Sequence, residues 1–347
     1  MKPFPSQTSV LVVGAGPAGL SAALALSRAG VDAVLIDARE RIGHPMRCGE
    51  MVFPYYFSVL GLEPRRQWLR WNLPKARMVV LNRPRMEFEL SEIIASRGVG
   101  VYSGTPLVGL GPFDGKGRCA KVLWKGKKRE IYAGCVIAAD GTASVTARLA
   151  GLDARLPPGR VASCVVQILS GAKPAMEDSY FVQPVAPFYF WVIPNGFGRL
   201  NVGLGVMGTE AGRARFLLSR LAAATKAFSG GKVKETFCAL MPARRPMAPL
   251  VHDGLMVTGN AGRLMDKGGS GILSAALSGR AAAETIIGLN GADPTATALE
   301  GYVQRIDPLL KRLEALWDLM ETGQAPSPPI LGMERGQLPP QYLEIGP

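Results

Sequence analysis

The stretch SVLVVGAGPAG, residues 9–19, joins an apolar, β-branched run to the glycine spacing G-x-G-x-x-G. Residues 20–28 are rich in Ala and Leu and predict a helix, and residues 33–36 form a second apolar strand. The glycines therefore stand inside a complete β-α-β unit, which is the context in which this spacing indicates dinucleotide binding.

Each glycine of the motif has a distinct task in such a unit. Gly14 makes the tight turn, Gly16 lets the backbone approach a pyrophosphate, and Gly19 lets helix and strand pack closely. The helix N-terminus offers N–H groups to the phosphates, and Asp37 ends the second strand, where a ribose hydroxyl needs an acceptor. We therefore predict a dinucleotide site made of Asp37 and the loop residues Gly14, Ala15, Gly16, Pro17, Ala18 and Gly19. A buried α/β unit with a glycine turn is the structural alternative.

The composition is that of a globular protein with a large core. The chain has 347 residues, of which 48% are hydrophobic and 19% charged, and its mean hydropathy is +0.15. The five cysteines are scattered and the two histidines are few, so we expect reduced thiols, a cytoplasmic protein and no metal site. Gly, Pro or charged residues interrupt every apolar run of about 18 residues, so we expect no transmembrane helix.

The net charge of +13 is strongly basic. Basic residues are spread along the chain without a nucleic-acid-binding motif, so we expect no nucleic-acid partner. A basic surface that aids solubility explains the charge. Attraction to an anionic membrane surface, where the protein would sit peripherally, or to an acidic electron donor is the alternative.

Changes of pattern divide the chain into two domains and a tail. The α/β domain is expected to be discontinuous and to comprise residues 1–50, 85–158 and 245–295. An antiparallel-sheet domain that holds the substrate is expected to comprise residues 51–84 and 159–244. Residues 296–347 predict a C-terminal helix with a Pro-rich tail.

Local patterns add detail to these domains. Residues 99–110 predict one strand, and Asn195-Gly196 between two apolar runs predicts a hairpin. A buried strand delivers Asp140-Gly141 at its C-terminal end, where the ligands of parallel sheets gather. Residues 254–287 return to the α/β pattern.

Three separated segments together resemble one flavoprotein plan. The loop at residues 14–19 with Asp37 resembles the ADP end of an FAD site, and Asp140-Gly141 resembles its middle segment. Residues 259–272 resemble the segment that holds the ribityl chain and the isoalloxazine.

Two further motifs narrow the resemblance. Arg47-Cys48-Gly49-Glu50 is the sharper one, and the run YFWVIP at residues 189–194 resembles a Y-x-W-x-F-P substrate-cavity motif. With these motifs the chain is similar to the geranylgeranyl reductase family of FAD-dependent, hydroxylase-like flavoproteins.

The resemblance implies an α/β fold, with a Rossmann-like FAD-binding domain of the glutathione-reductase type and an inserted antiparallel-sheet substrate domain. It implies reduction of isolated C=C bonds in a geranylgeranyl-type lipid or another isoprenoid by hydride from N5 of the flavin, with NAD(P)H or reduced ferredoxin as electron donor. The implied FAD-binding residues beyond the first loop are Asp37, Ala38, Arg39, Arg47, Cys48, Leu107, Asp140, Gly141, Gly259, Asn260, Gly268, Gly271 and Ile272. The implied substrate-binding residues are Tyr189, Trp191, Ile193 and Pro194.

The chain departs from the family pattern at three places. Gly259-Asn260 stands where the family has Gly-Asp, Asp266-Lys267 stands where a proline is expected, and Ile193 replaces the last aromatic residue. An Asn side chain still accepts a hydrogen bond from a ribityl hydroxyl, without the added strength of a charge.

Cys48 is the residue that we expect to carry chemistry, because its family counterpart lies beside the flavin. The neighbouring Arg47 favours the thiolate. An isolated alkene accepts hydride poorly until it is protonated, so Cys48, or a water that it holds, would supply the proton. The aromatic faces of Tyr189 and Trp191 would stabilise the resulting cation by about 1–2 kcal/mol each. An inert residue in a turn and ordinary core packing are the alternatives.

A second G-x-G-x-x-G, residues 203–208, lies on the return strand of the expected hairpin. No acidic residue stands at the required offset, so we interpret its glycines as thinning a cavity wall rather than binding NAD(P)H. Two other functions stay open: an FAD-dependent monooxygenase or halogenase-like enzyme, and a non-catalytic flavin electron-transfer protein.

Overall fold

The computed structural model describes residues 3–73, 77–154, 156–157, 160–174, 181–185, 188–207, 212–225, 228–265 and 271–321. The chain divides into two compact units. The first comprises Met1–His44, Glu87–Arg155 and Arg245–Trp317, and the second comprises Pro45–Met86, Leu156–Arg244 and Asp318–Pro347.

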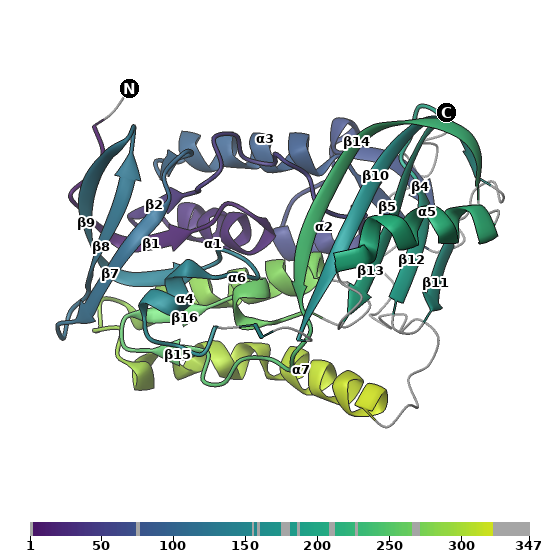
Figure 1. Cartoon of the computed structure of the whole chain (residues 1–347). Helices are drawn as coiled ribbons and strands as arrows, with labels where there is room; N and C mark the ends of the chain where they lie inside the picture. Colours follow the sequence, from purple (N-terminus) through teal and green to yellow (C-terminus); the bar gives the residue numbers. More distant parts are fainter. Residues whose placement is uncertain are drawn as a thin grey trace. The chain divides into compact units, whose positions relative to one another are not determined.

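A largely parallel sheet organises the first unit (Figure 1). Its central strand β1 (Gln7–Val13) pairs in parallel with β2 (Ala33–Ile36) on one side and β9 (Lys127–Ala138) on the other. Strand β6 (Gly100–Tyr102) extends the sheet beyond β2, and β16 (Leu255–Val257) and the short β15 (Val251–His252) extend it beyond β9. Every residue of β2 is buried, as expected for a strand of a covered parallel sheet.

The hairpin of β7 (Leu107–Phe113) and β8 (Arg118–Trp124) pairs with β9 at Arg118–Trp124. The prediction of one strand over residues 99–110 is therefore wrong: β6 ends at Tyr102 and β7 starts at Leu107. Between the two strands the backbone turns toward the end of β2, where the Thr105 N–H donates to the Asp37 carbonyl at 2.8 Å. This turn separates β6 from β7.

Two small-residue helices pack closely in this unit. Helix α1 (Pro17–Arg28) follows β1, and α6 (Ile272–Leu289) lies against it. The Ser21 hydroxyl donates to the Ala276 carbonyl at 2.8 Å, and a Cβ added to Gly279 would meet the Ala18 carbonyl oxygen at 2.0 Å. The glycine therefore permits the close approach of the two helices.

Helix α6 is long and apolar enough to cross a membrane, by length and composition alone. It carries the charged residues Arg280 and Glu284. Within the described residues, 61% of this segment is buried, and its packing on α1 is that of a core helix.

Three more helices complete the main elements of this part of the chain. Helix α3 (Arg83–Ser96) spans the boundary between the units. Helix α4 (Val145–Leu149) follows β9, and α7 (Ala296–Glu321) is fixed in part by Tyr302, whose hydroxyl donates to the Val257 carbonyl at 2.8 Å.

Antiparallel sheets build the second unit. The larger has the order β11 (Phe181–Val185), β12 (Phe188–Pro194), β13 (Arg199–Met207), β10 (Val161–Pro174) and β14 (Phe228–Pro242). The smaller has the order β3 (Met51–Val52), β5 (Met78–Leu81) and β4 (Leu69–Leu73). Helices α2 (Tyr55–Leu60) and α5 (Ala214–Thr225) and the 3-10 turn η1 (Arg66–Trp68) complete the unit.

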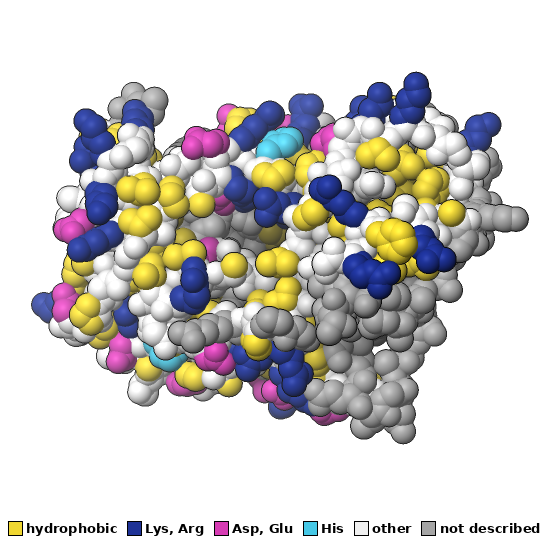
Figure 2. Space-filling view, in the orientation of Figure 1, with side chains coloured by type: hydrophobic (Ala, Val, Ile, Leu, Met, Phe, Trp, Pro, Cys, Tyr) yellow, Lys and Arg dark blue, Asp and Glu magenta, His cyan; other side chains and the backbone are white. Residues whose placement is uncertain are grey.

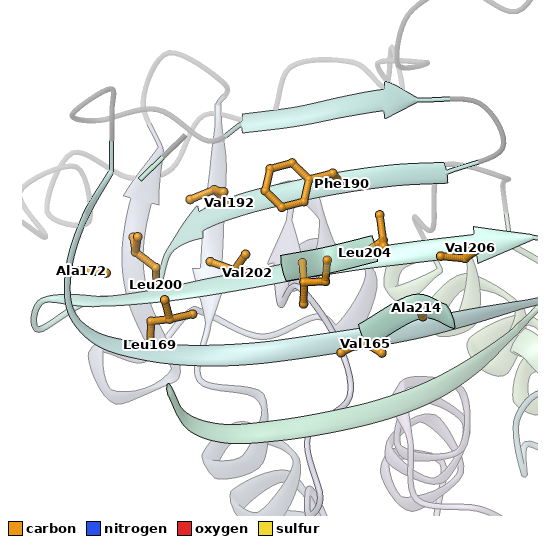
Figure 3. Packing of buried hydrophobic residues seen from close by; sticks show 11 residues of the cluster. Val165, Leu169, Ala172, Phe190, Val192, Leu200, Val202, Leu204, Val206 and Ala214 are labelled. Carbon is orange, nitrogen blue, oxygen red and sulfur yellow. The ribbon is translucent and has the colours of Figure 1, made fainter. Parts of the chain in front are cut away.

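Residues alternate between the two faces of the larger sheet. Phe190 and Val192 belong to the apolar cluster in Figure 3, which also includes Ala214 and Leu218 of α5. Trp191 and Ile193 belong to a separate cluster with Leu73, Val80 and Val166, which includes residues of the smaller sheet. One face of β12 thus packs on a helix and the other on the strands β4 and β5.

The hairpin between β12 and β13 is present, but its turn is longer than a two-residue Asn-Gly turn. β12 ends at Pro194 and β13 begins at Arg199, and the Asn195 N–H donates to the Arg199 carbonyl at 2.9 Å. Gly196, Phe197 and Gly198 all have positive φ, so the bend uses three left-handed residues.

These observations confirm the predicted fold class, a parallel-sheet α/β part with separate antiparallel sheets. In the division of the structure, most of α7 belongs with the first unit, up to Trp317.

Candidate flavin site and the Cys48 loop

The glycine loop is tightly packed at two of its glycines. Gly14 has φ +105°, and a Cβ added there would lie 2.4 Å from the Ala139 carbonyl oxygen. A Cβ on Gly19 would lie 1.7 Å from the Gly14 carbonyl oxygen. Neither position accepts a larger residue in this backbone, and the loop is held against both β9 and α1.

Gly16 differs, because a Cβ added there would meet no atom within 4 Å. It is the N-cap of α1, and no side chain caps that end of the helix. An open glycine beside an uncapped helix N-terminus fits a phosphate group approached by backbone N–H groups.

Asp37 is buried at the end of β2 and accepts four hydrogen bonds. The Ala15 N–H donates to Oδ2 at 2.6 Å, and the Arg39 N–H donates to Oδ1 at 2.7 Å. The Arg39 guanidinium donates to both oxygens, at 2.9 and 2.8 Å. Burial raises the pKa of this carboxyl, but the Arg39 side chain and the backbone N–H groups outweigh it and hold the pKa below its ordinary value.

A ribose hydroxyl could reach the ionised Asp37 carboxylate only by replacing one of these four donors. Its acceptor sites are filled, two of them by the Arg39 side chain, which is 29% exposed. A ribose hydroxyl would therefore exchange with the guanidinium and leave the bond from Ala15 in place.

The three segments assigned to FAD lie against one another within the first unit. The Thr258 N–H, just before Gly259, donates to the Ala138 carbonyl at 2.9 Å, which joins the third segment to the second. A Cβ on Gly259 would lie 3.0 Å from Cβ of Ala18, which joins the third segment to the first. Ala18 and Ala139 share a small cluster with Ala275. Small residues thus let three distant parts of the sequence converge.

Asp140 has a structural task in addition to its predicted one. Its Oδ1 accepts from the Ser144 hydroxyl at 2.5 Å, and its Oδ2 accepts from the N–H and hydroxyl of Thr146, both at 2.8 Å. These bonds fasten the start of α4. Gly141 beside it has φ +80° and no atom within 4 Å of an added Cβ, so its surroundings have room for a ligand.

The remaining predicted flavin residues of the first unit fall in varied environments. Leu107 is buried and Ala38 is exposed. Gly271 is the N-cap of α6, whose first residue is Ile272. An added Cβ on Gly271 would lie 3.2 Å from Oδ1 of Asn260, so this side chain points toward the start of the helix. Gly268 lies outside the described residues.

The predicted residues Arg47 and Cys48 lie in the second unit, in the loop of residues 45–50 that precedes β3. We call this segment the Cys48 loop. Arg47 is exposed and Cys48 is half-buried. The Glu50 N–H donates to Sγ of Cys48 at 3.3 Å, and Glu50 has φ 62°. A non-glycine residue in the left-handed region indicates that its surroundings fix the loop.

The Glu50 side chain supplies that restraint. The residue belongs to the Arg47-Cys48-Gly49-Glu50 motif, but no role was predicted for it. It is 0% exposed, and it accepts from the Arg83 N–H and from Nδ2 of Asn195, both at 3.1 Å. Nε of Arg70 lies 3.8 Å from Oε2. Burial raises the pKa of the Glu50 carboxyl, and the nearby Arg70, Asn195 and Arg83 oppose that rise without cancelling it.

The described residues of the predicted substrate strand are deeply packed. Trp191 and Ile193 are 6% and 2% exposed, and Pro194 is the last residue of β12. The indole N–H of Trp191 donates to Oδ1 of Asn201 at 2.9 Å. The backbone of Tyr189 pairs with Gly205, and its side chain lies outside the described part of the chain.

Gly203, from the second glycine motif, lies on β13 opposite Trp191. A Cβ there would lie 2.0 Å from the indole ring, so the glycine makes room for the tryptophan. Asn201, two residues earlier, is 0% exposed and was also missed. An Asn within an otherwise apolar strand is the signal that could have identified it, because a buried amide needs partners.

Comparison with known proteins places this geometry in a class. An FAD binding domain family matches residues 7–50. The structure is similar to a geranylgeranyl bacteriochlorophyll reductase-like protein from Thermoplasma acidophilum, with 25% identity, a TM-score of 0.83, and coverage of 91% of this chain and 87% of that one. The structure is also similar to the flavin-dependent halogenase CmlS, with 19% identity, a TM-score of 0.71, and coverage of 93% of this chain and 66% of that one. At this identity the similarity shows only a shared fold. The chain thus has the fold of an FAD-dependent oxidoreductase.

Curated relatives define the family. The digeranylgeranylglycerophospholipid reductase of Methanoculleus marisnigri is 34% identical over 302 residues, which cover 79% of this chain and 75% of that protein. The reductase of the same name from Methanosarcina acetivorans is 32% identical over 304 residues, which cover 79% and 74%. This chain belongs to the family of digeranylgeranylglycerophospholipid reductases, which confirms the resemblance, and it is an FAD-dependent enzyme.

Proposed function

We propose that this protein reduces isolated C=C bonds of a geranylgeranyl-type lipid with electrons from bound FAD. The observation that carries the proposal is the convergence of the three FAD segments in a member of a prenyl-lipid reductase family. The related reductases are named for digeranylgeranylglycerophospholipids, and a lipid of this class is the substrate we propose here.

The residues of the first unit would hold the cofactor. The open backbone at Gly16 would approach the pyrophosphate, and Asp37 would accept from the adenosine ribose. Asn260 would accept from the ribityl chain as an uncharged substitute for Asp. FAD, when bound and reduced, supplies hydride transfer from N5.

Cys48 would act in the second unit as the proton donor to the alkene. Protonation gives the more substituted carbon cationic character, and hydride addition to that carbon completes the reduction. The half-buried thiol is close enough to solvent to be reprotonated. Tyr189, Trp191, Ile193 and Pro194 stay predicted substrate contacts.

Product analysis tests this function directly. The enzyme is incubated without oxygen with dithionite as reductant and a digeranylgeranylglycerophospholipid as substrate. We expect the mass of the lipid to increase by two hydrogens for each bond reduced. The saturated phytanyl lipid is the control and should not change. A lipid of unchanged mass, with FAD bound and reduced, would contradict the proposal.

We also propose peripheral attachment to an anionic membrane surface, where such a lipid resides. Helix α5 presents Phe216, which is 50% exposed, with the Arg213 and Arg220 guanidinium groups 5.4 and 5.7 Å from its ring centre. An exposed aromatic ring between cations suits the headgroup region of a bilayer. NAD(P)H and reduced ferredoxin both stay candidate electron donors.

A further inference from the structure

Two buried amide side chains fasten the Cys48 loop to the β12–β13 hairpin. Nδ2 of Asn201 donates to the Cys48 carbonyl at 2.8 Å, and Nδ2 of Asn195 donates to Oε2 of Glu50 at 3.1 Å. Asn201 and Asn195 are 0% and 2% exposed. The loop is thus held at both ends by one hairpin, all within the second unit.

The orientation of the Asn201 amide is fixed by its two partners. The indole N–H of Trp191 can only donate, so it requires the amide oxygen. The Cys48 carbonyl can only accept, so it requires the amide nitrogen. The chain Trp191–Asn201–Cys48 therefore has one hydrogen-bonding arrangement, and rotating the amide by half a turn would break both bonds.

Trp191 is itself immobilised by packing. Its ring lies where the side chain of Gly203 would be, and the same face of the strand touches the loop at Gly49. A Cβ added to Gly49 would be 3.7 Å from Nε1 of Trp191 and 3.0 Å from Cδ1 of Ile193. The indole is therefore a fixed donor at the base of the loop.

We propose that Trp191 and Asn201 are positioning residues for Cys48. They fix its carbonyl and so set the direction of its thiol, while Asn195 anchors Glu50, whose N–H donates to the same sulfur at 3.3 Å. This inference rests on the proposed role of Cys48 as proton donor, and it gives Trp191 a task in addition to its predicted substrate contact.

The test is hydrogen exchange of the Cys48–Val52 backbone amides in the FAD-loaded protein, measured as the rate in each variant divided by the wild-type rate. Asn201→Asp keeps the acceptor for Trp191 and loses the donor to Cys48, so loop exchange should rise about two- to tenfold near neutral pH. Trp191→Phe removes the indole N–H together with part of the ring and leaves the Asn201–Cys48 bond possible, so it should give a smaller rise. Val202→Ala is the control. It shortens a side chain next to Asn201 on β13 but on the opposite face of the sheet, so loop exchange should stay at the wild-type rate.

Acidification supplies a second readout for Asn201→Asp. A protonated Asp offers one donor and one acceptor, which is what Asn201 uses here, and burial raises the pKa of the new carboxyl above its ordinary value of about 3.9, so the exchange ratio of Asn201→Asp should fall toward one as the pH is lowered through that raised pKa. The ratio for Trp191→Phe should stay constant over the same pH range. With lipid as substrate, Asn201→Asp should lower kcat with little change in KM.

Loop exchange at the wild-type rate in Asn201→Asp would overturn the proposal, and so would a rise of equal size in Val202→Ala. A wild-type protein that reduces no lipid would contradict only the proposed function, because the exchange ratio is measured without substrate.

Discussion

Gly16 shows at the scale of one residue a glycine that packing within the chain does not explain. Its φ of −84° is allowed for any L-residue, and an added Cβ would meet no protein atom within 4 Å. Packing within the chain therefore does not require glycine here, in contrast to Gly14, where an added Cβ would overlap the Ala139 carbonyl.

We expect Gly16→Ala to lower the stability of the apoprotein by no more than about 1 kcal/mol, the size of an N-cap effect. The added methyl group would stand where the pyrophosphate approaches, so FAD affinity should fall about tenfold or more, or about 1.4 kcal/mol. Urea unfolding and a titration with FAD measure the two quantities. Gly288→Ala, on α6 and also with open space around an added Cβ, is the control for FAD affinity. Wild-type FAD affinity in Gly16→Ala would be evidence against a phosphate site at this loop.

Glu50 should make stability depend on pH. Burial raises its pKa in the folded state, so its stabilising contribution is complete below the unfolded value of about 4.3 and is lost as pH rises through the raised folded pKa. Glu50→Gln cannot ionise. Its free energy of unfolding should therefore increase relative to that of wild type as pH rises through this window. Urea unfolding over a pH series measures the difference. Exposed Glu92→Gln is the control, and parallel pH profiles for Glu50→Gln and wild type would contradict the prediction.

At the scale of elements, β12 and β13 show what the sequence predicts and where it falls short. Trp191 and Ile193 are two residues apart and lie on one face of β12, as the side-chain period of a strand requires. The length of the turn was not predictable from Asn195-Gly196, since Phe197 also adopts a left-handed conformation. The partners of Asn201 and Glu50 come from distant segments, so no local pattern reveals them.

The close pairing of these strands predicts a stability effect. A Cβ on Gly203 would lie 2.0 Å from the buried indole ring, so Gly203→Ala should destabilise the protein by about 1–3 kcal/mol through overpacking. Combining it with Trp191→Leu should recover part of that loss, because the smaller side chain vacates the site. Denaturant midpoints of the two single variants and the double variant measure the coupling. Strictly additive losses would show that the glycine and the indole do not compete for the same space.

On the scale of the whole chain, the parallel sheet brings together the three segments that the sequence predicts for FAD. Each segment ends a strand or opens a helix, so the parallel sheet brings them together once the fold class is right. Charge was less informative. Figure 2 shows Lys and Arg scattered among apolar side chains on the visible face, so the net charge of +13 does not by itself identify a binding surface.

The surface formed by Phe216, Arg213 and Arg220 at α5 nevertheless predicts lipid binding that depends on Phe216. The protein should sediment with vesicles rich in phosphatidylglycerol and much less with phosphatidylcholine alone, and binding should weaken as salt rises. Phe216→Ala should reduce binding about fivefold or more through lost apolar contact. Phe88→Ala on α3, which removes another exposed ring (42% exposed), is the matched control and should bind as wild type does. Equal binding by both variants would place the membrane contact elsewhere.

The central claim, that electrons pass from the bound flavin to a prenyl double bond, is tested most directly in a single turnover without oxygen. The flavin is reduced with dithionite, excess reductant is removed, and a digeranylgeranylglycerophospholipid is added while the oxidised-flavin absorbance is followed. We predict that the absorbance returns with lipid and that the lipid gains two hydrogens for each flavin reoxidised, with Cys48→Ser much slower than wild type. A flavin that stays reduced with lipid but is reoxidised rapidly by air would contradict the account and indicate a monooxygenase or an electron carrier.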